Sequence, residues 1–205
     1  MRIFLAFVLA LSVVTPAYAD TPMDQVLKQE QRGLFGLSAT RLSKLLHSTG
    51  KVENISYSKE WLAGLPAAQG GEDWRCLAEA LYFEARGESV KGQFAVAEVI
   101  MNRVDSPRFP DTVCGVIHQG TGRKYQCQFT FTCDGHAEVI ANPQAFERVG
   151  KVAKLILSGA PRALTDGATY YHTNAVAPKW SRKFARTTTI GVHHFYRPQT
   201  ELSQN

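Results

Sequence analysis

The sequence predicts an α+β domain that is mostly helical and carries a small antiparallel β-sheet. Two consecutive segments, residues 74–86 and 90–104, carry apolar side chains at helical spacing. The last third, GATYYHTNAVAPKWSRKFARTTTIGVHHFYR, is rich in Thr, Tyr, Val and Phe. It predicts two or three short strands around a loop that holds Pro178 and Trp180.

The first core helix is expected to begin at Trp74, with Asp73 as its N-cap and Gly87 just past its C-terminus in a left-handed conformation. Its predicted buried stripe consists of Trp74, Leu77, Ala78, Leu81 and Ala85. At about 100° per residue, Glu84 lies roughly 20° from Leu77, whereas Glu79 lies roughly 160° from it. Glu84 is therefore expected to point inward and Glu79 to point toward water.

The stretch Glu84-Ala85-Arg86-Gly87-Glu88 raises a chemical question, because two carboxylates bracket an arginine at the end of this helix. Burial and the negative end of the helix dipole should both raise the pKa of Glu84. Such a carboxyl group suits general acid catalysis on a glycosidic bond. Alternatively, Glu84 and Arg86 form a buried ion pair that only fixes the turn, and the residues alone favour neither reading.

The second helix, Val90 to Val104, is apolar on most sides and is predicted to be a core helix. Its polar residues Lys91, Glu98 and Asn102 share one narrow face. A shorter helix is expected from Thr112 to His118, and another over residues 143–157.

The first twenty residues, MRIFLAFVLALSVVTPAYAD, have the pattern of a secretory signal peptide cut between Ala19 and Asp20. We expect an exported protein, periplasmic or associated with the cell envelope, without stable membrane insertion. The formal charge of +5 becomes 5 − 1 = +4 when Arg2 leaves with the signal, a modest excess that suits an anionic partner and selects none. The predicted organisation is a signal peptide at 1–19, a weakly structured leader with short helices at 20–71, a main domain at 72–198 and a tail at 199–205.

The four cysteines are Cys76, Cys114, Cys127 and Cys133. An even number in an exported chain predicts disulfides, and no C-x-x-C pair supports the competing zinc site. Among three possible connectivities we favour Cys76 with Cys114 and Cys127 with Cys133. In a straight strand the latter two would lie roughly 20 Å apart, so this pairing requires the segment YQCQFTFTCDG to bend.

Five motifs in order resemble the cell wall hydrolase family of the spore cortex-lytic enzymes. They are LAEALYFEARGESVKGQFAVAEVIMNRV, FPDTVCGVIHQ, CQFTFTCDG, ATYYHTNAVAPKW and IGVHHFY. The resemblance covers nearly all of residues 74–197. It implies a lysozyme-like, lytic-transglycosylase-type fold, so that the segment 72–198 would be a cell wall hydrolase catalytic domain.

The resemblance implies that Glu84 is the catalytic acid and base, with Glu88 and Arg86 in support. The expected reaction is cleavage of the β-1,4 bond between MurNAc and GlcNAc in peptidoglycan, with formation of 1,6-anhydro-MurNAc. Spore enzymes of this family often carry an N-terminal peptidoglycan-binding repeat, and residues 20–70 do not resemble one. The cysteines suit a periplasm better than a spore coat, so we expect a wall-remodelling enzyme of a bacterium that need not sporulate.

Several polar and aromatic residues are candidates for sugar binding, because flat apolar faces with polar edges suit saccharides. They are Gln128, Asp134, Tyr171, His172, Trp180 and His194. A structural turn role for Gln128 and Asp134 is equally compatible with the sequence. His193 and His194 point to opposite faces of a strand, so at most one lines a cleft. No ligand spacing supports a metal site, and we expect neither metal nor cofactor.

The sequence is also compatible with two other function classes. The first is a non-catalytic module that binds the cell wall, and the second is a zinc-dependent amidase or peptidase that cuts the peptide stems. The expected partner in the enzymatic reading is the peptidoglycan glycan strand, not nucleic acid, and the protein is expected to act as a monomer.

Overall fold

The computed structural model describes residues 28, 54–122 and 126–198. The chain divides into two units, residues 1–36 and 37–205, and all helices and strands from residue 54 onward belong to the second. The predicted signal peptide, most of the predicted leader and the tail lie outside the described residues. Within the described residues, no helix has both the length and the apolar character needed to cross a membrane.

The first described helix of this unit is α3, Lys59–Gly64, which Ser58 caps by accepting from the backbone of Trp61. Leu62 is fully buried, and the buried Lys151 of helix α7 (Pro143–Leu157) donates to the carbonyl of Ala63 at 3.2 Å. Residues within the predicted leader thus pack on the main domain.

Helix α4 spans Glu72–Ala85, two residues longer at its start than predicted. The predicted Asp73 cap is wrong: Gly71 is the N-cap without a side-chain bond, and Asp73 lies in the first turn. The prediction of a left-handed Gly87 is also wrong. The chain instead leaves α4 through a tight turn, in which the amide of Glu88 donates to the carbonyl of Ala85 at 3.0 Å.

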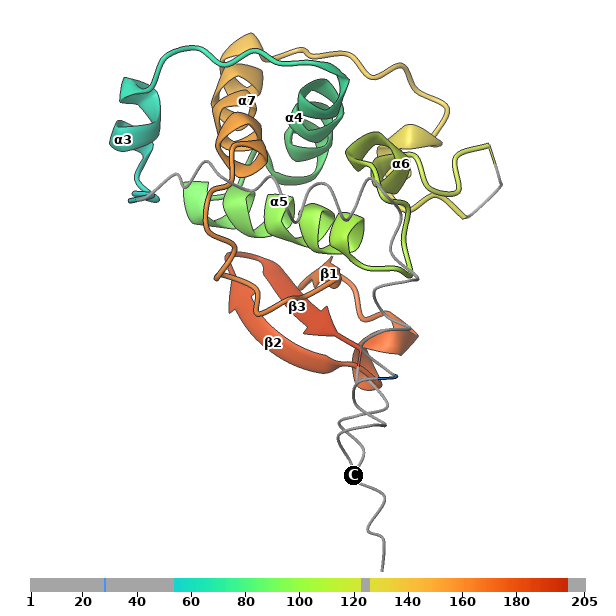
Figure 1. Cartoon of the computed structure of the whole chain (residues 1–205). Helices are drawn as coiled ribbons and strands as arrows, with labels where there is room; N and C mark the ends of the chain where they lie inside the picture. The colour runs from blue at the N-terminus through green and yellow to red at the C-terminus, as the bar shows by residue number, and fades with distance from the viewer. Residues whose placement is uncertain (1–27, 29–53, 123–125, 199–205) are drawn as a thin grey trace, which may run out of the picture. The chain divides into compact units, whose positions relative to one another are not determined.

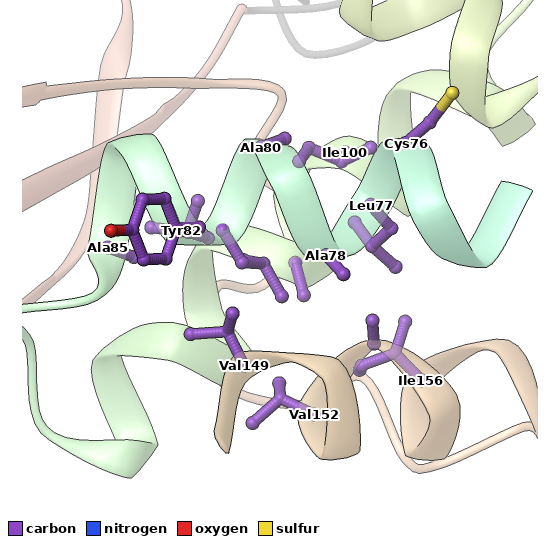
Figure 2. Close-up of a cluster of buried hydrophobic side chains, with 14 of the residues drawn as sticks. Cys76, Leu77, Ala78, Ala80, Tyr82, Ala85, Ile100, Val149, Val152 and Ile156 are labelled. Carbon is purple, nitrogen blue, oxygen red and sulfur yellow. The ribbon is translucent and has the colours of Figure 1, made fainter. Parts of the chain in front are cut away.

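The core lies between α4, α5 (Val90–Asp105) and α7 (Pro143–Leu157). Figure 2 shows Leu77 and Ala78 of α4 facing Val149, Val152 and Ile156 of α7. Each of these side chains is buried, and burying one the size of valine, leucine or isoleucine is worth roughly 1.5–3 kcal/mol. The predicted helical stripe of α4 is confirmed except at Trp74, which is only partly buried.

Both favoured disulfide pairings are present. Cys76 of α4 is bonded to Cys114 of α6 (Val113–Ile117). Cys127 is bonded to Cys133 across a loop that contains the 3-10 helix η1, Thr130–Thr132. The segment between these cysteines bends, as their short separation requires.

Among residues 54–122 and 126–198, three antiparallel strands form a sheet in the order β1-β3-β2. These are β1 (Tyr170–Thr173), β2 (Ala185–Ile190) and β3 (His193–Arg197), and the 3-10 helix η2 (Lys179–Arg182) lies in the loop after β1. In Figure 1, α5 runs between the sheet on one side and helices α4 and α7 on the other. Phe195 of β3 packs against Ala95 and Val99 of α5, so one face of the sheet is directed at the helices.

The loop before β1 is held to α5 by a buried carboxylate. Glu98 is 1% exposed, although its sequence position suggested a polar helix face. It accepts hydrogen bonds from the backbone amides of Leu164 and Thr165 and from the Thr165 hydroxyl, at 3.0, 2.9 and 2.6 Å. Asn102 donates to the carbonyl of Ala168 at 2.9 Å. These contacts set where strand β1 begins.

Candidate active site

Glu84 lies at the end of α4 and meets the first strand of the sheet. The hydroxyl of Tyr171 donates to Oε2 of Glu84 at 3.2 Å across 87 residues of sequence. Glu84 is partly buried, as its helical position predicted, whereas Glu79 is directed away and pairs with exposed Arg75 at 3.5 Å. The inward carboxyl group is thus joined to a strand through Tyr171, a residue predicted to bind sugar.

Arg103 of α5 lies beside this pair and was not among the predicted site residues. It is only 2% exposed, and its Nε donates to the carbonyl of Thr169 at 2.7 Å. Its guanidinium lies 5.5–5.9 Å from the ring centres of Phe109, Phe129 and Tyr170. A single arginine on the predicted core helix was the sequence signal, because a buried cation needs partners.

Gln128, a predicted sugar ligand, lies against Arg103. When its side-chain amide is oriented with the oxygen toward the guanidinium, it accepts from both Nη atoms at 3.2 Å. The disulfide loop also carries Phe129 onto Arg103, and Phe131 stacks on Phe83 of α4 at 4.8 Å. The bent loop therefore builds one wall around the arginine.

Opposing influences set the proton affinity of Glu84. Burial raises the pKa of this carboxyl group above its ordinary value of 4.5. The Tyr171 hydrogen bond and the positive charge of Arg103 act in the opposite direction. Burial also raises the pKa of Tyr171 well above 10, so its hydroxyl remains a donor. Burial thus favours the protonated acid more than in an exposed glutamate, and the two neighbours stabilise the carboxylate that forms when the proton leaves.

Arg86 does not form the ion pair with Glu84 that the sequence left open. Its Nη1 donates to the carbonyl of Tyr82 at 3.0 Å, and its guanidinium lies 4.8 Å above the Tyr82 ring. The cation that acts on Glu84 is Arg103, from a different helix.

Glu88 occupies a niche between the start of α5 and the β2–β3 turn. Its side chain is 12% exposed, and its Oε1 lies 3.5 Å from Nδ1 of the buried His193. Burial lowers the pKa of His193 below 6.5, outweighing the opposite effect of Glu88. A Cβ at Gly191, where φ is +60°, would overlap the Glu88 carboxylate, and one at Gly92 would press on it at 3.0 Å. Two glycines thus make room for this carboxylate.

The predicted sugar ligands on the sheet divide between its two faces. Tyr171 pairs with Phe195 on the face toward α5, whereas His172 pairs with His194 on the other face. Trp180 lies beside these two histidines, with its ring centre 5.6 Å from that of His172. His172, His194 and Trp180 form what we call the outer group. The structure therefore brings Tyr171 to Glu84 and places His172, Trp180 and His194 together elsewhere.

Hydrogen bonds order the outer group of aromatic and imidazole rings. His172 lies between the carbonyl of Thr173 and the hydroxyl of Tyr196, at 2.8 and 2.9 Å from its ring nitrogens. Arg186 Nε donates to the same hydroxyl at 3.2 Å. The His194 ring lies 2.9 Å from the Thr189 hydroxyl, and burial, Arg186 and His172 lower its pKa below 6.5.

The remaining predicted ligand, Asp134, lies on an exposed loop. Its Oδ1 accepts from the backbone amide of His136 at 2.8 Å, a turn contact. Within the described ranges, no three or more His, Cys, Asp or Glu side chains gather as a metal site would require. All four cysteines are in disulfides and none is a free thiolate.

An α+β domain with an inward carboxyl group of raised pKa at a helix end is suited to general acid catalysis. The chain belongs to the Cell Wall Hydrolase family, whose model matches residues 87–196. That range contains Glu88, Arg103 and Tyr171, and it begins three residues after Glu84. The family that the five sequence motifs resemble is thereby confirmed.

Relatives of this chain are spore cortex-lytic enzymes. The one from Halalkalibacterium halodurans is 37% identical over 139 residues, 66% of this chain and 38% of that protein. The one from Bacillus subtilis is 42% identical over 87 residues, 42% of this chain and 27% of that protein. The chain thus spans well under half the length of these two relatives.

A solved structure agrees with the α+β fold. The catalytic domain of the germination-specific lytic transglycosylase SleB from Bacillus anthracis is 34% identical in sequence, with a TM-score of 0.50. The match covers 65% of this chain and all of that domain.

Proposed function

We propose that this protein is a peptidoglycan-degrading enzyme that cleaves the MurNAc–GlcNAc β-1,4 bond as a lytic transglycosylase, with Glu84 as acid and base. The observation that carries the proposal is the partly buried Glu84 carboxyl group. Burial raises its pKa, and both the Tyr171 hydroxyl and the Arg103 charge stabilise its anion. Membership of the Cell Wall Hydrolase family and similarity to a lytic transglycosylase catalytic domain support the choice of polymer.

In the proposed reaction Glu84 acts twice. Its protonated form gives the proton to the glycosidic oxygen, which leaves as the C4 hydroxyl of GlcNAc when the bond to C1 of MurNAc breaks. The carboxylate, stabilised by Tyr171 and Arg103, then takes the proton from the C6 hydroxyl of the same MurNAc as O6 bonds to C1. The proton returns to Glu84 and no water is consumed, so one carboxyl group suffices.

The supporting residues have distinct proposed roles. Hydrolysis ordinarily needs a second carboxylate, and Glu88, the nearest in sequence, is directed to His193. We assign Glu88 to shaping the site, and Arg86 to holding the turn that follows α4. On the outer sheet face, His172, Trp180 and His194 offer ring faces to a sugar further along the glycan.

The proposal is tested with Glu84→Gln, which matches the acid in size and cannot donate and recover a proton. We expect it to abolish release of soluble muropeptides from purified sacculi at an unchanged or higher melting temperature. Glu79→Gln, on the same helix and directed away, is the matched control and should keep full activity. Retained activity in Glu84→Gln would reject the assigned acid.

The product separates the enzyme classes. Digestion of sacculi in heavy-oxygen water should give 1,6-anhydro ends without label, whereas labelled reducing ends would indicate a muramidase. A wall-binding module would release nothing. An amidase would release stems and lose activity with a chelator, whereas we expect resistance to chelation.

We further propose that the protein acts as an exported monomer, in the periplasm or cell envelope, after removal of residues 1–19. The sequence pattern of the first twenty residues supports export. Edman sequencing of the secreted protein should give Asp20 as its first residue.

A further inference from the structure

A cavity of about 330 Å³ lies beside the active-site turn and is not used by the proposed reaction. Its lining comes from four parts of the fold: Lys59 of α3, Arg86 to Glu88 after α4, Val90 and Gln93 of α5, and Arg148 of α7. Glu84 does not line it. The cavity and the acid are therefore separate, joined by the short turn that connects α4 to α5.

The charge of this cavity is mainly positive. Lys59, Arg86 and Arg148 contribute three cations, against the single carboxylate of Glu88. None of the three has a carboxylate partner among the described residues, whereas Arg75, Lys151, Arg162 and Arg197 each do. Val90 and Gln93 belong to the first turn of α5. This N-terminal end of the helix dipole carries partial positive charge and therefore favours an anion. Such a cavity favours a negatively charged ligand.

A buried polar atom narrows the chemistry of the ligand. Gln93 is 3% exposed and lines the cavity, and its Oε1 has no hydrogen-bond partner in the described part of the chain. Its Nε2 makes only a long contact of 3.4 Å, to the carbonyl of Glu88. A buried acceptor without a donor is energetically unfavourable, so a ligand N–H is the natural complement.

We propose that this cavity binds an acidic peptide, with a carboxylate between Lys59 and Arg148 and an amide N–H on Gln93 Oε1. This oxygen now lies beneath the cavity surface, and the proposed binding includes a rotation of the Gln93 side chain that brings it to the ligand. A bare phosphate would satisfy the cations and leave Gln93 unpaired, which favours a peptide. If the proposed action on peptidoglycan holds, the ligand is the peptide stem of the glycan strand. The cavity then binds the peptide stem while Glu84 acts on the glycosidic bond.

Direct binding is measured first, by NMR titration of Glu84→Gln with N-acetylmuramoyl-L-alanyl-D-glutamate and with its diamide. We expect changes in the backbone amide chemical shifts of Val90, Gln93 and Arg148. The parent compound, which carries two carboxylates, should bind at least about fivefold more tightly than its diamide. Each exposed charge contributes about two- to fivefold. The double variant Lys59→Gln, Arg148→Gln should therefore lose this difference.

The matched control is the double variant Arg108→Gln, Lys154→Gln. It removes one lysine and one arginine from exposed positions that do not line the cavity, and it should keep the preference. Equal binding of dicarboxylate and diamide by the parent protein, or shifts confined to other parts of the fold, would overturn the inference.

Activity then separates this inference from the proposed function. Release of product is compared between sacculi and glycan strands stripped of their stems by an amidase. We expect faster release from stemmed glycan, and equal rates in the Lys59→Gln, Arg148→Gln variant. If the parent releases nothing while the dicarboxylate preference persists, the proposed function fails and the peptide site stands. If the parent cleaves both substrates equally and shows no binding preference, the reverse holds.

Discussion

Replacing Arg103 with methionine tests the arrangement around Glu84 most directly. Methionine approximates the length of the arginine stem and removes the charge and all donors. The carbonyl of Thr169 loses its 2.7 Å bond in a buried position, which costs about 1–3 kcal/mol. Gln128 is partly exposed, so in the variant its side chain can hydrogen-bond to water. The folded variant also no longer has to bury a charged guanidinium, which offsets part of the lost stability.

We therefore expect Arg103→Met to lower the free energy of unfolding by about 1–3 kcal/mol. For a chain of this size the melting temperature falls by roughly 2–4 °C per kcal/mol. Urea denaturation followed by circular dichroism measures the first quantity, and calorimetry measures the second.

The same variant changes the pH dependence of catalysis. Arg103 lowers the pKa of Glu84, so its removal raises that pKa. General acid catalysis needs the protonated form, and activity is lost as pH rises through the pKa. The alkaline limb of kcat/KM against pH should therefore move to higher pH in Arg103→Met, and less so in Arg103→Lys, which keeps the charge. A limb at the wild-type pH, together with the expected loss of stability, would refute an electrostatic role for Arg103.

Three further predictions concern the acid, its donor and the disulfides. Tyr171→Phe removes a hydrogen bond that lowers the pKa of Glu84, and should also move the alkaline limb of the pH profile upward; an unchanged limb would mean that the bond is absent in solution. Because folding raises the pKa of Glu84, the wild type loses stability as pH rises from 4.5 through the raised pKa. Glu84→Gln should therefore have a higher melting temperature than the wild type at pH 8, and this difference should disappear below pH 4.5. Replacing both cysteines of the disulfide between α4 and α6, which spans 38 residues, with serine should lower the free energy of unfolding by about 4 kcal/mol. The same change at the disulfide that spans 6 residues should lower it by about 2 kcal/mol. Equal losses in chemical denaturation would contradict the loop-entropy argument.

Local patterns in the sequence determined most of the secondary structure and the direction of the acid. Helical periodicity predicted the buried stripe of α4 and the inward side of Glu84, because side-chain direction repeats every 3.6 residues whatever the helix packs against. Pro143 to Leu157 was predicted with the bounds that the structure has. The end of α4 was less predictable, since the conformation of Gly87 depends on how the chain turns into α5.

What surrounds the acid was decided by tertiary structure alone. Arg86 is two residues from Glu84 and contacts Tyr82 instead, whereas Arg103 and Tyr171 reach the site from another helix and from a strand. Strand alternation placed His193 and His194 on opposite faces, but only the packing of the sheet on α5 set His193 beside Glu88. Periodicity defines which way a side chain points within its own element. Which side chain it meets depends on the packing of elements far apart in the sequence, and that packing places a cation and a hydroxyl donor around Glu84.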